Sequence, residues 1–107
     1  MSKFIFAYHG GKQFESEEQG KAHMTKWMAW NDGLGDAVVD PGWPVGPSKT
    51  VSAHGVDDNG GANPLSGITI IEAKTMAAAL DMAKSCPHVD IGGTIEVAEA
   101  FQMIPDS

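Results

Sequence analysis

The segment KAHMTKWMAW, residues 21–30, combines a histidine and two tryptophans at helical spacing. At 100° per residue, His23, Trp27 and Trp30 fall on one side of a helix. Large apolar rings beside an imidazole form a wall that shifts its pKa and stacks on an aromatic ligand. Two interpretations stay open: His23 is a hydrogen-bonded core residue, or it is a proton-transfer group that lines a pocket.

Two further segments carry candidate pocket residues. In CPH, Cys86 falls at the predicted C-terminal end of a helix, where the helix dipole disfavours a thiolate, and His88 follows a proline. A small buried side chain is the simpler interpretation of Cys86, because free cysteine usually behaves as a hydrophobe. Trp43 lies in the rigid segment GWPVGPS, where it either caps a pocket or packs at a dimer interface.

No metal site or cofactor site is predicted. The histidines lack HxH, HxxxH or other ligand spacing, and the glycine pairs match no phosphate-binding loop. The loop aspartates are explained as turn formers. The histidines are His9, His23, His54 and His88. The loop aspartates are Asp36, Asp40, Asp57 and Asp58.

The sequence predicts four strands and two helices. Alternating or β-branched apolar residues predict strands over 3–9, 50–56, 67–72 and 94–103, the last with Ile95, Val97, Phe101 and Met103 on one face. The segment 35–48 is predicted as a structured loop with a short extended piece over 37–40.

Capping residues locate the two helices. Ser16 with Gln19 is a capping-box pattern that opens a helix, which we expect to run to about residue 32 and to stop at Gly33. Thr75 is the predicted N-cap of a second helix over 76–85. Its expected inward residues are Met76, Leu80 and Ala83.

The element order βαββαβ predicts an α+β fold of the ferredoxin-like type in a single domain spanning residues 1–107. Two helices then cover one face of an antiparallel sheet. The strands carry apolar residues toward both faces, and an exposed patch of that size is rare in monomers. We therefore expect a homodimer that covers the second face.

Composition argues against several partners. Seven basic residues face fourteen acidic ones, the net charge is −7, and arginine is absent. Without clustered cations, neither a nucleic acid nor an anionic membrane is an expected partner. The single cysteine allows no intramolecular disulfide, and no signal-peptide or membrane-span pattern is present, so a cytoplasmic protein is expected.

The chain resembles the YCII-related family over nearly its whole length. The order of the pieces carries this resemblance: the helix with His23 and WMAW, then GWPVGPSKTVS, NPLSGITIIEA, the alanine-rich helix ending in KSCPH, and GGTIEV. It implies a dimeric α/β barrel of two ferredoxin-like protomers. It also implies the His–Asp pair of some members, whose aspartate precedes a proline, and a branch linked to dehydrochlorination of a chlorinated hydroquinone.

Two positions depart from the family pattern. Cys86 stands where the aspartate would be, and NPLSG stands near the place of the DGPF tetrapeptide. The His–Asp chemistry is therefore not carried over to this chain, although His23 matches the family histidine. The leading functional prediction is a lyase or isomerase acting on a small cyclic or aromatic compound, with His23 as the proton-transfer group. Trp27, Trp30, Trp43, Cys86 and His88 would shape its pocket. The alternative is a non-catalytic ligand-binding or regulatory module.

Overall fold

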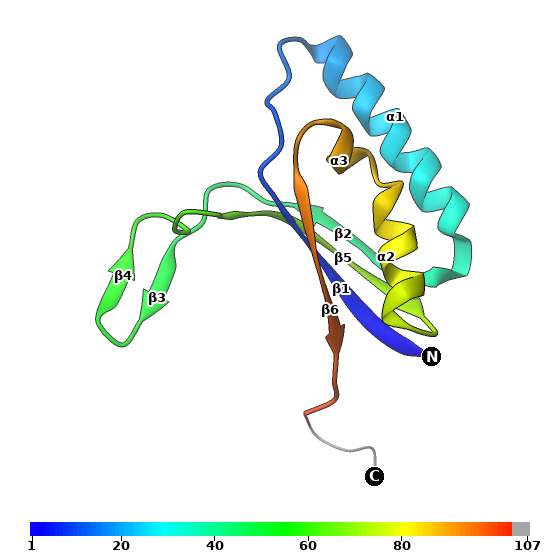
Figure 1. The fold of residues 1–107 in the computed structure, drawn as a ribbon. Helices are drawn as coiled ribbons and strands as arrows, with labels where there is room; N and C mark the ends of the chain where they lie inside the picture. Colours follow the sequence, from blue (N-terminus) through cyan, green and yellow to red (C-terminus); the bar gives the residue numbers. More distant parts are fainter. Residues whose placement is uncertain (104–107) are drawn as a thin grey trace.

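Four strands pair into one antiparallel sheet in the computed structural model, which describes residues 1–103 (Figure 1). Their order across the sheet is β2 (Val38–Pro44), β5 (Leu65–Ala73), β1 (Ser2–His9) and β6 (Thr94–Ala100). The helices α1 (Glu17–Leu34), α2 (Met76–Lys84) and α3 (Pro87–Asp90) lie on one face of this sheet. The chain is thus an α+β protein, compatible with the predicted ferredoxin-like arrangement.

The core lies between the sheet and the helices. Phe4, Phe6 and Tyr8 of β1 alternate toward the helices and are buried, as the strand pattern predicts. From α2, Ala79 and Ala83 are buried, whereas the predicted core residues Met76 and Leu80 are about 40% exposed. The prediction for Met76 and Leu80 is wrong because α2 turns its small alanine side chains toward the sheet.

Helix α1 begins where its cap predicts and ends later than expected. The Ser16 hydroxyl accepts a hydrogen bond from the backbone N–H of Gln19 at 3.2 Å. Gly33 lies inside the helix, and Gly35, with a φ of 57°, provides the C-cap by donating to the carbonyls of Asn31 and Asp32.

Strand β2 occupies half of the predicted loop and lengthens the short extended piece predicted over 37–40. Its pairing with β5 is interrupted by two register shifts, between Val38 and Asp40 and between Asp40 and Trp43. Proline fits here because β2 is an edge strand, and bulges allow a strand to carry turn-forming residues. The Asp40 carboxylate accepts a hydrogen bond from the N–H of Gly42 at 2.8 Å, which fixes the local bend.

The predicted strand over 50–56 is instead a separate hairpin. Strands β3 (Thr50–Ser52) and β4 (Gly55–Asp57) pair only with each other among the described strands, and the hairpin projects from the sheet away from the helices (Figure 1). Every residue of both strands is exposed. The radius of gyration, 15.4 Å, exceeds the roughly 13 Å of a compact chain of this length, in keeping with the projection.

The last strand is shorter than predicted. β6 ends at Ala100, so only Ile95 and Val97 of the four predicted inward residues pack against the core. Phe101 and Met103 follow the strand, beyond its last residue paired with β1, and are 82% and 92% exposed.

Over residues 1–103, none of the helices combines the length and the apolar character that crossing a bilayer requires.

Candidate functional site

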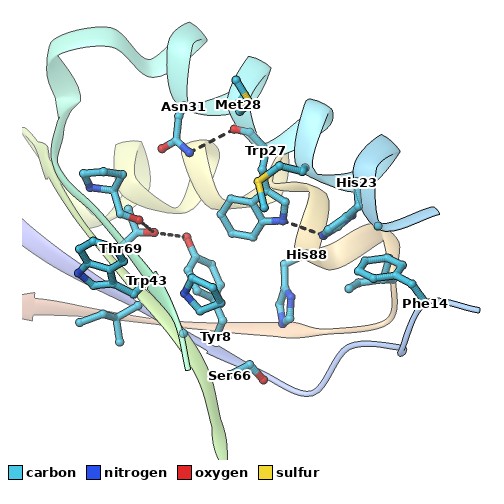
Figure 2. Close-up of a pocket in the computed structure, with 18 residues that line it drawn as sticks. Tyr8, Phe14, His23, Trp27, Met28, Asn31, Trp43, Ser66, Thr69 and His88 are labelled. Atoms are coloured by element: carbon cyan, nitrogen blue, oxygen red, sulfur yellow. Dashed lines mark hydrogen bonds between the residues drawn. The ribbon is translucent and has the colours of Figure 1, made fainter. Parts of the chain in front are cut away.

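A cavity of about 440 Å³ lies between α1 and the edge of the sheet formed by β2 and β5 (Figure 2). This volume is within the usual range for small-molecule sites. Aromatic, methionine, proline and isoleucine residues make up more than half of its lining. The lining residues are Tyr8, Phe14, Gly20, His23, Met24, Trp27, Met28, Asn31, Pro41, Gly42, Trp43, Pro44, Ser66, Gly67, Ile68, Thr69, His88 and Ile91.

Trp27 and His23 form a hydrogen-bonded pair on the α1 side of the cavity. The indole N–H of Trp27 donates to Nε2 of His23 at 2.7 Å (Figure 2). An indole nitrogen is only a donor, so Nε2 is unprotonated and the neutral ring carries its hydrogen on Nδ1. Burial, and then the nearby His88 and Lys26, lower the pKa of His23, while Asp90 opposes them. His23 therefore lines a cavity, as predicted, and is partly exposed rather than enclosed in the core.

Trp30 lies behind Trp27 and does not line the cavity. Its indole N–H donates to the backbone carbonyl of Met82 at 3.1 Å, and its ring packs edge-on against Trp27 with centroids 5.3 Å apart. Trp30 is buried among Phe6 and the other core side chains. The pocket prediction for Trp30 is corrected accordingly: one helix turns only part of an apolar stripe toward the cavity and the rest toward the core.

A chain of hydroxyl groups joins three strands at the floor of the cavity. The Tyr8 hydroxyl donates to Oγ1 of Thr69 at 2.8 Å, and Thr69 donates to the carbonyl of Pro41 at 3.1 Å. Burial raises the pKa of Tyr8 well above its ordinary value, so the phenol stays protonated at neutral pH. This chain fixes β1, β5 and β2 relative to one another.

Strand β2 supplies the opposite wall. Pro41, Gly42, Trp43 and Pro44 all line the cavity. Trp43 is 76% exposed, so its indole forms part of the rim.

His88 is a buried, firmly held polar side chain of the cavity. It is 6% exposed, and its Nε2–H donates to the backbone carbonyl of His9 at 2.8 Å. A Cβ on Gly93 would overlap the imidazole, and a Cβ on Gly11 would approach its Cε1 to 3.0 Å. The ring also packs edge-on against Tyr8. Two glycines therefore make room for one histidine ring.

Cys86 is buried next to the cavity without lining it. It is 1% exposed and is the N-cap residue of α3. Burial raises the pKa of the thiol to about 11, so it remains protonated at neutral pH. The expected pocket role of Cys86 is replaced by a structural one at the start of α3.

The cavity wall is uncharged apart from what its histidines can carry. Among residues 1–103, no Asp, Glu, Lys or Arg lines it. Asn31 donates to the carbonyl of Trp27 at 3.1 Å, and its Oδ1 is buried without a hydrogen-bond partner. Within the same described range, no group of three His, Cys, Asp or Glu side chains has metal-binding geometry.

Sequence reasoning missed Tyr8, Thr69 and Asn31. Their elements were predicted, but strand periodicity marks Tyr8 and Thr69 only as inward-facing, and Asn31 only as flanking the histidine stripe. Their convergence depends on the β1–β5 register, which pairs Tyr8 with Gly67 and Phe6 with Thr69. The sequence carries no direct signal of that register.

A comparison with models of known protein families found no match, and a comparison with curated proteins found none either.

Proposed function

We propose that the protein binds a small, flat, cyclic or aromatic compound in the cavity between α1 and β2. The observation that carries this proposal is the composition of the cavity wall. Trp27, Tyr8, Phe14 and Trp43 line a space of about 440 Å³, and the wall exposes few polar atoms to it. Ring faces stack well on indole and phenol rings, and their burial supplies most of the binding free energy.

The polar groups of the cavity favour an uncharged ligand. With no ammonium, guanidinium or carboxylate in the described wall, a charged ligand would lose its hydration without gaining an ion pair. The available side-chain partners include the Nδ1–H of His23 and the ring of His88. Such sparse, fixed polar groups orient a ligand within an apolar site.

Two functions use this pocket. One is a lyase or isomerase in which a pocket histidine moves a proton, supported by two imidazoles on one cavity. The other is a non-catalytic ligand-binding or regulatory module, for which the cavity suffices. The first requires that a histidine substitution abolish turnover while leaving ligand affinity in place.

Titration of ¹⁵N-labelled protein with a library of uncharged ring compounds tests the binding proposal. We expect binders to shift the indole N–H signals of Trp27 and Trp43, and Trp27→Ala to weaken binding by at least tenfold. Met76→Ala is a matched control, because Met76 is an exposed apolar residue outside the cavity. A library that shifts neither indole signal would refute the proposal.

We further propose that two copies pair through the open face of the sheet, as in a YCII-related dimeric α/β barrel. Ile5 lies opposite Ile70, and Ala7 lies opposite Ile68, on the face away from the helices. Helices do not cover this face (Figure 1), and a second copy would remove its apolar side chains from water.

A further inference from the structure

We infer that His88, through Nδ1, is the proton acceptor of the cavity and that His23 is a hydrogen-bond donor to the ligand. This assignment rests on the proposed function, since both groups must meet a ligand in the same cavity. It reverses the expectation that His23 is the base.

The hydrogen bond from Trp27 prevents His23 from acting as a base in this arrangement. A neutral imidazole has one lone pair in the ring plane, and on His23 that lone pair, on Nε2, accepts the Trp27 N–H at 2.7 Å. The remaining ring nitrogen carries a hydrogen. His23 therefore presents a donor to the cavity, suited to an oxygen on which negative charge develops.

His88 has the opposite arrangement. Its Nε2–H is fixed on the carbonyl of His9 at 2.8 Å, so the lone pair of the neutral ring is on Nδ1. Nδ1 makes no hydrogen bond within the described chain, and the ring lines the cavity. Gly93 and Gly11 leave the space that the ring fills, and Tyr8 packs against it. A base must be held in one orientation, and these contacts hold this one.

Together the two rings form a complementary pair on one cavity, an acceptor on α3 and a donor on α1; Figure 2 labels both. The chemical class that this pair fits is a carbon acid whose electrons move onto an oxygen. Nδ1 of His88 takes the proton, the C–H electron pair enters a new π bond, and the displaced pair reaches an oxygen that accepts the Nδ1–H of His23. Histidine as a neutral donor to an oxyanion is an established catalytic use of imidazole.

The uncharged aromatic probe 5-nitrobenzisoxazole reports on this pair. Its base-catalysed opening transfers the ring C–H proton to the base, converts that electron pair into the third bond of a nitrile, and breaks the N–O bond to release a phenolate. His88→Gln keeps an N–H that can donate to the His9 carbonyl but removes the basic nitrogen. His23→Asn keeps a donor in place of Nδ1–H, and His54→Gln alters an exposed histidine outside the cavity.

We expect His88→Gln to lower the rate constant for the probe by about 100-fold, which is the usual size of general-base catalysis. His23→Asn should lower the rate constant by less than tenfold, and His54→Gln should leave it unchanged. Binding of the unreactive analogue benzotriazole, followed by tryptophan fluorescence, should be retained in all four proteins, because the aromatic wall supplies most of the binding free energy. Loss of turnover in His23→Asn with retention in His88→Gln would overturn the inference. So would wild-type turnover no faster than that of His88→Gln. Failure of the wild type to bind benzotriazole would instead refute binding of this ring class, and the inference with it.

Long-range ¹H–¹⁵N correlation spectra of the unsubstituted protein test the same assignment without a variant. At a pH where both rings are neutral, we expect hydrogen on Nε2 of His88 and on Nδ1 of His23. The reverse tautomers would contradict the assigned roles.

Discussion

The indole N–H of Trp27 decides which nitrogen of the neutral His23 ring carries the hydrogen. The contact stabilises the neutral ring, because a protonated Nε2 could not accept from an indole donor. Burial acts in the same direction, since it disfavours the charged form. The folded-state pKa of His23 therefore lies below the 6.5 of an unperturbed ring.

Trp27→Phe should raise the pKa of His23 toward its ordinary value by removing this donor. In the wild type the unfolded chain binds the His23 proton first as the pH falls, so His23 lowers the free energy of unfolding as the pH drops through 6.5 and below. The variant should show a smaller decrease. NMR titration of the His23 ring protons measures the shift, and Trp43→Phe, which removes no donor to His23, is the control. An unchanged His23 midpoint in Trp27→Phe would show that the hydrogen bond is unimportant in solution.

Cys86 should be nearly inert toward thiol reagents. A thiol that is 1% exposed and has a pKa of about 11 is neither accessible nor ionised at pH 7. We expect 5,5′-dithiobis(2-nitrobenzoate) to modify the native protein far more slowly than it modifies glutathione, and to modify it at once in urea. Modification of the native protein faster than glutathione would contradict the buried position.

At the scale of elements, Gly42 makes the bent strand β2 possible. Its φ of +74° is a conformation that L side chains rarely adopt, and a Cβ there would overlap the carbonyl of Ile68 on β5. Gly42→Ala should lower the free energy of unfolding by more than about 2 kcal/mol, because both strain and a clash oppose the β2–β5 pairing. Urea denaturation measures the change. Gly46→Ala, where nothing lies within 4 Å, should stay within about 0.5 kcal/mol of wild type; equal effects at both positions would refute this explanation.

The helix starts were predictable because they depend on local chemistry. Ser16 and Thr75 cap their helices through hydrogen bonds to residues three positions ahead, and this spacing is visible in the sequence. The end of α1 was less predictable. Gly33 costs a helix little compared with the packing that holds its last turn, so the helix continues to Gly35.

Only the start of strand β2, within the extended piece expected over 37–40, was predictable, because the residues that follow carry genuine turn signals. Asp40 and Gly42 do form a local, turn-like hydrogen bond. The chain nevertheless continues as a strand with a bulge at this point, because its backbone pairs with the long strand β5. The same limit applies to the site. His23 was found because helical spacing places it beside Trp27. The importance of His88 depends in part on Gly11, which contacts its ring but is distant from it in sequence. Trp30 and Cys86 are residue types that also occur in pocket walls, but both face the core.

At the scale of the molecule, a monomer would leave the apolar side chains of the open sheet face in contact with water. Ile5 and Ile70 are directly paired at its centre, and Ile5 is 37% exposed. Ile70→Glu should convert the proposed dimer into a monomer, because a carboxylate buried between two sheets would lack a partner. Light scattering should then report one 11.3 kDa chain instead of two.

Leu80→Glu is the control for this prediction, because Leu80 is similarly exposed but belongs to α2 on the helix side. It should leave the mass unchanged. A wild type that scatters as a single chain, or a dimer lost only in Leu80→Glu, would contradict pairing through the sheet face.

The hairpin β3–β4 gives the chain a place to accept foreign sequence. Ser52 lies opposite Gly55, so an insert between Ala53 and His54 would leave and re-enter at adjacent points of the backbone. Both valines of the hairpin, Val51 and Val56, are already more than 60% exposed, so an insert there would uncover little additional apolar surface. A fluorescent protein or epitope fused at this point should leave the melting temperature of the domain and its ligand affinity unchanged, which makes the hairpin a practical handle for labelling the protein in living cells.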